Sequence, residues 1–403
     1  MNSTKNTGLL STLSGSVKSI ITLLAVSSIL SFQGCENTPN DVGLNYIPGT
    51  DTTSVKFLDS ETDTMAITSN NYEYYINTLL ATNISVGRFQ NYESKALLKF
   101  YTFPGDYDSA DVLSAVLTLR YGDYSFQDKQ GLTDFNIHRV VNNLNYSTIT
   151  YDSVSASDFG SKVIGSFSSV VADSSSINID LDPKVLKDWF EYAADTNFAV
   201  KNYGMALLPN LSSSVIKGFF EFNDDVNYVP TITALVSKNG TVDTVKLIAS
   251  LGVTLSNVVS ISIPQDEFII QSGVAYRNIL NFDLSKLPTN AIINNATLQF
   301  TLDNSNSFYS ASSDKTITIG MVTDSVNKTD SLFTEAFLRD TIVYSVALNS
   351  VVQRWNSGIM PNLGISLRSQ SEIQNLNYFT FYAPTYADIT KRPRLSITYT
   401  LRH

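Results

Sequence analysis

Cysteine, histidine and positive charge are all scarce in this chain of 403 residues, and each scarcity excludes a class of function. A single cysteine excludes a disulfide framework and any metal site built from several thiolates. The only histidines are His138 and the last residue, His403, which argues against catalysis by a Ser–His–Asp triad. With 27 Lys and Arg against 37 Asp and Glu, the chain is a poor candidate for binding nucleic acid.

Recognisable catalytic motifs are missing as well. The sequence has no Gly-x-Ser-x-Gly elbow, no HExxH helix, no glycine-rich phosphate loop and no complete EF-hand loop. Two facing carboxylates would suffice for a glycosidase, and such residues can lie far apart in sequence. We therefore expect no enzyme, and a carboxylate-dependent polysaccharide-degrading enzyme stays open as the less favoured alternative.

The N-terminus carries an apolar run that is too short to cross a membrane. Residues 20–32 are uncharged and follow Lys5 and Lys18. This is the length of a signal-peptide core, whereas a membrane-spanning helix needs about 20 apolar residues. The run leads into Gly34 and Cys35, the only cysteine of the chain. An ordinary secretory leader with a chance cysteine would give the same pattern.

The segment Ser31-Phe32-Gln33-Gly34-Cys35 resembles the lipobox of bacterial lipoproteins. The resemblance implies that residues 1–34 are a removed signal peptide, that Cys35 is acylated, and that residues 35–50 form a polar tether. Several acyl chains would anchor the protein stably to a membrane. Residues 41–48 also resemble the start of a family of uncharacterised surface lipoproteins. The implied location is the cell envelope, at the outer membrane or cell surface.

The rest of the chain contains an internal duplication. Seven short segments recur in the same order, at an offset of about 160 to 182 residues. The only two tryptophans, Trp189 and Trp355, fall at equivalent positions. The matched segments are 97–100 with 279–282, 115–119 with 296–300, 135–137 with 317–319, 185–189 with 351–355, 202–205 with 362–365, 219–222 with 379–382 and 229–232 with 392–395.

Each copy has the pattern of short, half-buried strands separated by Gly, Asn, Asp and Ser turns. One helix interrupts the strands in each copy, and its tryptophan is expected to pack against the sheet. In the first copy Asp182 can cap the helix and Pro183 fits its first position. In the second copy we expect Asn349 to cap the helix and Gly358 to end it.

These patterns predict an all-β protein made of two tandem, jelly-roll-like β-sandwiches with one short helix each. We expect the first module over residues 51–238 and the second over residues 239–402. The linker is expected at about residues 237–243, where Asn239-Gly240 is a turn signal.

The layout resembles the DNRLRE domain, a jelly-roll-like module of exported proteins that is related to carbohydrate-binding modules. The shared pattern is an Ala-x-Leu-x-Leu-type strand, a Trp-bearing helix, an Asn-x-Gly before a strand and a Pro that opens the last strand. In the first copy the pattern falls on Ala115, Leu117, Leu119, Trp189, Asn202, Gly204 and Pro230, and in the second on Ala296, Leu298, Phe300, Trp355, Asn362, Gly364 and Pro393. The middle stretch departs from it, because the tryptophans usual there are replaced by Leu144 and Tyr151 in the first copy and are lost around residues 323–332 in the second.

Aromatic side chains are the candidate ligand-binding residues, since exposed rings on a β-sandwich can stack on the faces of sugars. The alternative is that tyrosines alternating along strands are packing residues. The candidates are Tyr72, Tyr74, Tyr75, Tyr121, Tyr124 and Phe126.

Acidic and amide side chains could hold a structural Ca²⁺, the only cofactor that the sequence suggests. Asp180 with Asp182, or Asn223-Asp224-Asp225, would offer the oxygen ligands that Ca²⁺ prefers. Roles in turns and helix caps explain the same residues.

Together these features predict a membrane-anchored surface protein whose non-catalytic modules bind a glycan or another extracellular polymer. The nearest alternative is a structural or adhesion protein of the envelope whose sandwiches contact other proteins. An exposed aromatic cluster flanked by polar groups on one sheet face would favour the glycan, whereas an apolar patch without a polar rim would favour a protein partner.

Overall fold

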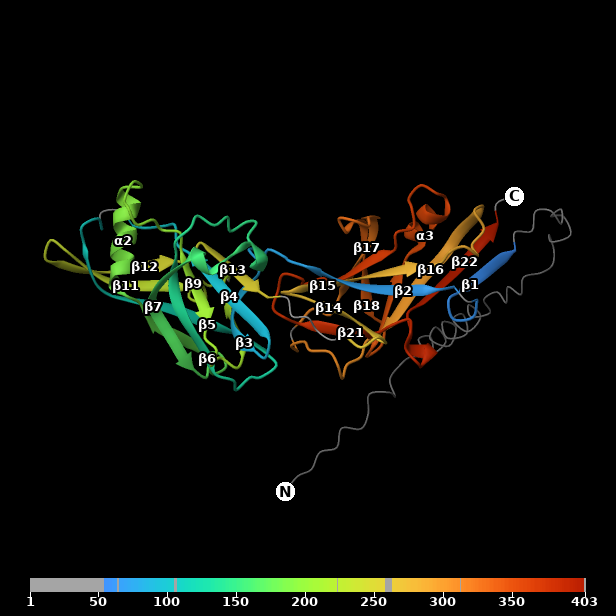
Figure 1. Ribbon diagram of the computed structural model, residues 1–403, viewed down its shortest axis with the longest axis horizontal. Helices are drawn as coiled ribbons and strands as arrows, with labels where there is room; N and C mark the ends of the chain where they lie inside the picture. The colour runs from blue at the N-terminus through green and yellow to red at the C-terminus, as the bar shows by residue number, and fades with distance from the viewer. Residues whose placement is uncertain are drawn as a thin grey trace, which may run out of the picture. The chain divides into compact units, whose positions relative to one another are not determined.

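The computed structural model describes residues 54–401, except residues 64, 105–106, 223, 258–262 and 312. In this part of the chain two 11-stranded antiparallel sheets each curl into a sandwich, and each sandwich carries one α-helix (Figure 1). The prediction of an all-β fold with one short helix per sandwich is confirmed. The predicted leader, the lipidation residue Cys35 and the tether lie outside the described residues.

The first sandwich is a continuous stretch of chain with the helix α2 (Pro183–Ala194) between its strands β8 and β9. Its sheet has the order β12-β11-β5-β10-β3-β4-β9-β6-β7, with β13 beside β4 and β8 beside β5. The strands are β3 (Asn83–Phe89), β4 (Tyr92–Lys99), β5 (Asp111–Phe126), β6 (Thr133–Val140), β7 (Phe159–Ser169), β8 (Ser176–Asp180), β9 (Met205–Pro209), β10 (Ile216–Phe220), β11 (Thr231–Lys238), β12 (Thr241–Ile248) and β13 (Leu251–Ser256).

The second sandwich is built from two separate stretches of chain, with the helix α3 (Asn349–Asn356) between β19 and β20. Its sheet has the order β1-β22-β16-β19-β18-β17-β20-β15-β14-β21, with β2 beside β15. The strands are β1 (Val55–Asp59), β2 (Ile67–Tyr74), β14 (Glu267–Gln271), β15 (Ala275–Phe282), β16 (Ala291–Thr301), β17 (Ile317–Asp324), β18 (Thr329–Leu338), β19 (Val343–Ala347), β20 (Ile365–Ser369), β21 (Tyr378–Tyr382) and β22 (Arg394–Leu401).

The division of the chain between the sandwiches differs from the predicted boundary at residues 238 and 239. β1 pairs with β22 and β2 pairs with β15, so both strands belong to the second sandwich although they precede the first in sequence. β12 and β13 take the corresponding places in the first sandwich, against β11 and β4. The first sandwich is therefore inserted between β2 and β14 of the second.

The physical reason is the turn that was expected to be a linker. Asn239 and Gly240 have φ angles of +52° and +80°, and the residues on either side, Lys238 and Thr241, are paired across the turn. Two central residues with positive φ make the tight turn that suits the twist of a β-hairpin. The turn returns β12 along β11, which leaves the equivalent edge of β22 open for β1.

The duplication itself is visible in the packing. β5 pairs with β8 and β11 in the first sandwich, as β16 pairs with β19 and β22 in the second. The ring centres of Trp189 and Phe100 are 6.1 Å apart, with an interplanar angle of 32°. Those of Trp355 and Phe282 are 6.2 Å apart, with an angle of 34°. Both tryptophans are buried, as predicted.

The Asn-x-Gly segments have the same local role in both copies. The side chains of Asn202 and Asn362 donate to the main-chain oxygens of Phe100 and Phe282, each at 2.8 Å. The glycine two residues later has a positive φ, 101° at Gly204, and a Cβ there would lie 2.4 Å from the carbonyl oxygen of Leu98. Glycine is required because no side chain fits this close approach of two backbones.

The two helices begin differently. Asp182 caps α2 as predicted, because its carboxylate accepts from the Lys184 main-chain amide at 3.0 Å and Pro183 follows. The predicted cap Asn349 is wrong: Leu348 is the capping residue of α3, and the Asn349 side chain instead accepts from the main-chain amide of Ala296 at 2.8 Å. Gly358, with φ at +71°, follows the end of α3 as expected.

The outer faces of the two sandwiches, opposite their hydrophobic cores, are covered to different degrees. In the first sandwich residues 141–158 connect β6 to β7, and Tyr146 and Ile149 from this segment pack on Leu97, Ala206 and Val253 of the sheet. In the second sandwich residues 325–328 make a short turn between β17 and β18. Within the described residues, therefore, no such segment covers the outer face of β17, β18 and β20.

Candidate functional site

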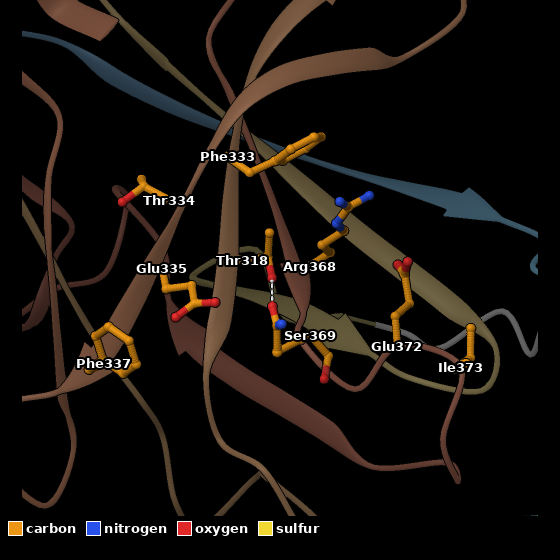
Figure 2. Close-up of a pocket in the computed structure, with 10 residues that line it drawn as sticks. Thr318, Phe333, Thr334, Glu335, Phe337, Arg368, Ser369, Glu372 and Ile373 are labelled. Carbon is orange, nitrogen blue, oxygen red and sulfur yellow. Dashed lines mark hydrogen bonds between the residues drawn. The ribbon is translucent and has the colours of Figure 1, made fainter. Parts of the chain in front are cut away.

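This uncovered face holds an open groove of about 750 Å³, which we call the β18 groove. Residues on alternate positions of three neighbouring strands face it because side chains along a strand point to opposite sides. Ile317, Ile319 and Leu367 enter the core, and Thr318 and Arg368 point the other way. Figure 2 shows the groove. Its lining comprises Thr318, Phe333, Thr334, Glu335, Phe337, Arg368, Ser369, Gln370, Glu372 and Ile373.

Two phenylalanines on β18 are the apolar part of the β18 groove. Phe333 is 53% exposed and Phe337 is 56% exposed, while Ala336 between the strand's outward positions is buried in the core. The Arg368 guanidinium lies over the Phe333 ring, 4.7 Å from its centre, and Figure 2 shows the two side chains next to each other. Large exposed rings on a sheet face are an open surface for stacking with a ligand.

Polar groups lie beside these rings. The Thr318 hydroxyl bonds to the Gln370 side-chain oxygen, as the dashed line in Figure 2 marks. This bond leaves the Gln370 amide nitrogen as a donor for a ligand. Glu335 pairs in register with Thr318 and adds a carboxylate to the lining. The β18 groove thus combines two aromatic rings with a guanidinium, a carboxylate and an amide.

One wall of the β18 groove is held by a buried ion pair. Arg277 on β15 donates from Nε and Nη2 to the two carboxylate oxygens of Glu372, both at 2.6 Å. The Tyr74 ring covers the guanidinium, with 3.9 Å between the guanidinium carbon and the ring centre. Burial would lower the pKa of Arg277, but the hydrogen bonds and charge of Glu372 raise it above its usual value. Glu372 is therefore held in place at the rim.

Three of the predicted aromatic residues lie outside the lining of the β18 groove, and two of them, Tyr72 and Tyr74, are neighbours of Arg277. Tyr74 stacks on Arg277, and Tyr72 is paired in register with Arg277. Burial raises the pKa of Tyr72. Tyr75 follows the end of β2 and is 37% exposed. Tyr72 and Tyr74 support the Arg277 side of the wall, whereas Tyr75 has no contact with Arg277 among those described; Tyr74 is 43% exposed but lies outside the lining of the groove.

The other three predicted aromatic residues are wrong as stacking platforms, because they are buried. Tyr121 is part of the first sandwich's core. Tyr124 and Phe126 pack in a cluster that also includes Val274 and Leu376 of the second sandwich. The Tyr124 hydroxyl oxygen accepts the Leu376 main-chain amide at 2.9 Å. These residues hold the two sandwiches in contact.

None of the residues that line the β18 groove is among the residues predicted from the sequence, because the family pattern is lost around residues 323–332, directly before Phe333. The signal that could have found them is the alternation Phe333, Glu335, Phe337, with a polar or aromatic residue at each outward position. Strand pairing places Ser166 and Leu208 of the first sandwich where the second has Glu335 and Arg368. The groove chemistry is not repeated at these positions.

Of the predicted calcium ligands, Asp182 has other partners. Asp182 caps α2 and its carboxylate accepts from Lys162 Nζ at 2.6 Å. Asp180 lies on the exposed side of β8, and Asn223 is outside the described residues. Among the residues that the structure describes, no cluster of three or more His, Cys, Asp or Glu side chains could hold a metal ion.

Two titratable side chains outside the β18 groove, Glu221 and His138, form contacts within the first sandwich. Burial raises the pKa of the Glu221 carboxyl to about 8, and one of its oxygens accepts the Gly252 main-chain amide at 2.7 Å. Glu221 thus belongs to the contact between the end of β10 and β13. His138 Nδ1 lies 2.7 Å from the carbonyl oxygen of Gly160 on the neighbouring strand.

In the described ranges of the chain, no helix has the length and apolar character needed to cross a membrane. Comparison of the chain with family models, with characterised proteins and with solved structures finds no match. The resemblances to the lipobox and to the DNRLRE domain consequently rest on the residues of this chain alone.

Proposed function

We propose that this protein is a lipid-anchored component of the cell envelope whose second sandwich binds a polysaccharide in the β18 groove. The observation that carries the proposal is the pair of exposed rings, Phe333 and Phe337, beside Arg368, Glu335 and Gln370. Rings stack on the apolar faces of sugars, and polar groups at their edges bond to hydroxyls. The open form of the groove suits a long chain that continues beyond it.

The polar surroundings of the rings favour a glycan over a protein partner. A site for a protein would be expected to have an apolar centre from which charged groups are depleted. Here a carboxylate, of the kind depleted at such centres, separates the two phenylalanines along β18, and a guanidinium lies directly over one ring. These groups have the hydrogen-bonding capacity that sugar hydroxyls require.

Binding is favoured over hydrolysis by the state of the carboxylates. A glycosidase needs two acids that face the substrate. Of the two glutamates lining the β18 groove, Glu372 is bonded through both oxygens to Arg277. Glu335 is left as the one carboxylate without such an ion pair in this lining. We infer a non-catalytic binding surface.

The anchor is proposed from Cys35 and the apolar run that precedes it. Replacing Cys35 with Ser removes the sulfur that would carry the acyl chains. The variant is expected to leave the membrane fraction when cells are fractionated. A variant that stays in the membrane fraction would contradict the anchor.

The binding proposal is tested on a glycan array with residues 36–403, beside a turnover assay on the same polysaccharides. We expect saturable binding without turnover. In a follow-up titration Phe333→Ala should weaken binding about tenfold, since aromatic stacking and the buried ring area together contribute about 1.4 kcal/mol or more. Phe222→Ala is the matched control, because Phe222 is an exposed ring on the first sandwich.

Each other outcome has a defined meaning. Turnover of a bound polysaccharide would overthrow the non-catalytic reading in favour of a hydrolase or lyase. Equal loss of binding in the Phe333 and Phe222 variants would place the site elsewhere. Absence of binding on the whole array would favour the alternative, a structural protein that contacts other proteins.

A further inference from the structure

A second candidate site lies on the first sandwich, where the end of β4 meets α2 and the segment that covers the outer face. Two neighbouring hollows of about 320 and 560 Å³ share three residues, Lys99, Tyr101 and Asn143. The smaller hollow continues to Lys201, and the larger one to Tyr146. This place is separate from the β18 groove, which lies on the other sandwich.

Lys99 is the residue that needs an explanation. It is 8% exposed, and its amine lies 4.8 Å from the centre of the Tyr101 ring and 5.5 Å from that of Tyr146. Among the described residues, these two rings are the partners of the amine, with no ion pair or hydrogen bond beside them. The amine of this mostly buried side chain thus has only aromatic rings as partners, and it is left open to a ligand that enters the hollows.

The surroundings of Lys99 are positive in an acidic chain. Lys201 lines the same hollow, and its amine bonds to the main-chain oxygen of Thr196 at 2.6 Å and lies 5.4 Å from the Tyr192 ring. None of the described residues lining either hollow is acidic. The chain as a whole has ten more acidic than basic residues. Such a local gathering of amines attracts negative charge.

Tyr101 gives the site an aromatic surface. Its side chain is 56% exposed and borders both hollows next to the Lys99 amine. The exposed amide of Asn143 completes the shared rim. The matched positions of the second sandwich carry Asn281 and Asp283 in place of Lys99 and Tyr101, so this arrangement belongs to the first copy.

We propose that these hollows bind the anionic group, a carboxylate or a sulfate, of a ring-bearing ligand of the saccharide type. The anion bonds to the Lys99 amine, with Lys201 as a second positive charge, while the ligand ring lies on Tyr101. The amide of Asn143 donates at the edge. An anion held by a buried amine is bound through a charge-assisted hydrogen bond, which is the stronger kind. This inference goes beyond the polysaccharide binding proposed for the β18 groove.

The test is calorimetric titration of residues 36–403 carrying Phe333→Ala, so that binding in the β18 groove is weakened about tenfold in every measurement. The probes are a galacturonate tetrasaccharide, a sulfated galactan tetrasaccharide and a neutral galactan tetrasaccharide. At least one anionic probe should bind about tenfold more tightly than the neutral one, and the difference should shrink with added salt. Which of the two anionic probes binds shows whether the site recognises a carboxylate or a sulfate.

Lys99→Met keeps the length of the side chain and removes its charge, and it should weaken anionic binding about tenfold. Lys201→Met should weaken it less and tests the site without touching the buried position. Lys246→Met is the control, because Lys246 is an exposed lysine of β12. Equal affinity for neutral and anionic probes, absence of binding of both anionic probes, or unchanged affinity in both lysine variants would overturn the proposal. None of these outcomes bears on the β18 groove.

Discussion

A chain shortened to begin at residue 75 is expected to lose the fold of the second sandwich and to keep that of the first. The deletion removes β1 and β2, and with them Leu58 and Met65, which are buried in the core of the second sandwich. Truncating one buried Leu or Met side chain costs about 2–5 kcal/mol, and a domain has about 5–15 kcal/mol in total. The deletion also leaves β22 and β15 with open edges that favour aggregation.

The two tryptophans report each sandwich separately, because Trp189 lies in the first and Trp355 in the second. With Trp189→Phe, the shortened chain should show the red-shifted emission of a solvent-exposed Trp355. With Trp355→Phe, the emission of Trp189 should stay native. A chain beginning at residue 54 is the control and should unfold as the full chain does. The reverse pattern, with Trp189 exposed, would mean that β1 and β2 belong to the first sandwich.

Glu372→Gln is expected to lower the free energy of unfolding of the second sandwich by about 3–5 kcal/mol. The change leaves the Arg277 guanidinium buried without its counter-charge, and both side chains are close to inaccessible, at 7% and 12% exposure. Replacing both residues with Met should recover much of the loss, since the unpaired charge is then removed as well. Denaturant unfolding followed by Trp355 fluorescence measures the effect.

An exposed ion pair provides the comparison for this prediction. Lys187 and Asp111 are 2.8 Å apart, with side-chain exposures of 45% and 74%. Lys187→Met should leave the free energy of unfolding nearly unchanged, because water and salt screen such a pair. If Glu372→Gln costs no more than Lys187→Met, the Arg277 pair does not stabilise the wall of the β18 groove in the way described.

The strands, helices and duplication could be predicted from the sequence because they depend on local patterns. The alternation of apolar residues, the Asp182-Pro183 helix start and the position of each tryptophan are all visible within a few residues. The choice of partner for β1 could not be predicted in this way. The residues of β1 would fit the edge of either sandwich. β1 pairs with β22 because the hairpin at Asn239-Gly240 places β12 on the equivalent edge of β11.

The candidate site was harder to predict, because burial on a curled sheet depends on the whole fold. Tyr124 and Phe126 lie at alternating positions of a strand, as Phe333 and Phe337 do, yet the first pair is buried and the second exposed. The difference arises from distant segments: loops of the second sandwich cover Tyr124, and the short turn at residues 325–328 leaves β18 open. Neither the covering of Tyr124 nor the exposure of β18 can be predicted from the residues next to them in the sequence.

The central claim is that the uncovered face of β17, β18 and β20 is where this protein meets a polysaccharide. The most direct measurement is hydrogen–deuterium exchange of residues 36–403 with and without the polysaccharide that the array identifies. We expect slower exchange in peptides spanning residues 317–338 and 365–373, and loss of this protection in Phe333→Ala. Unchanged exchange in those peptides at saturating ligand, whatever else is protected, would contradict it.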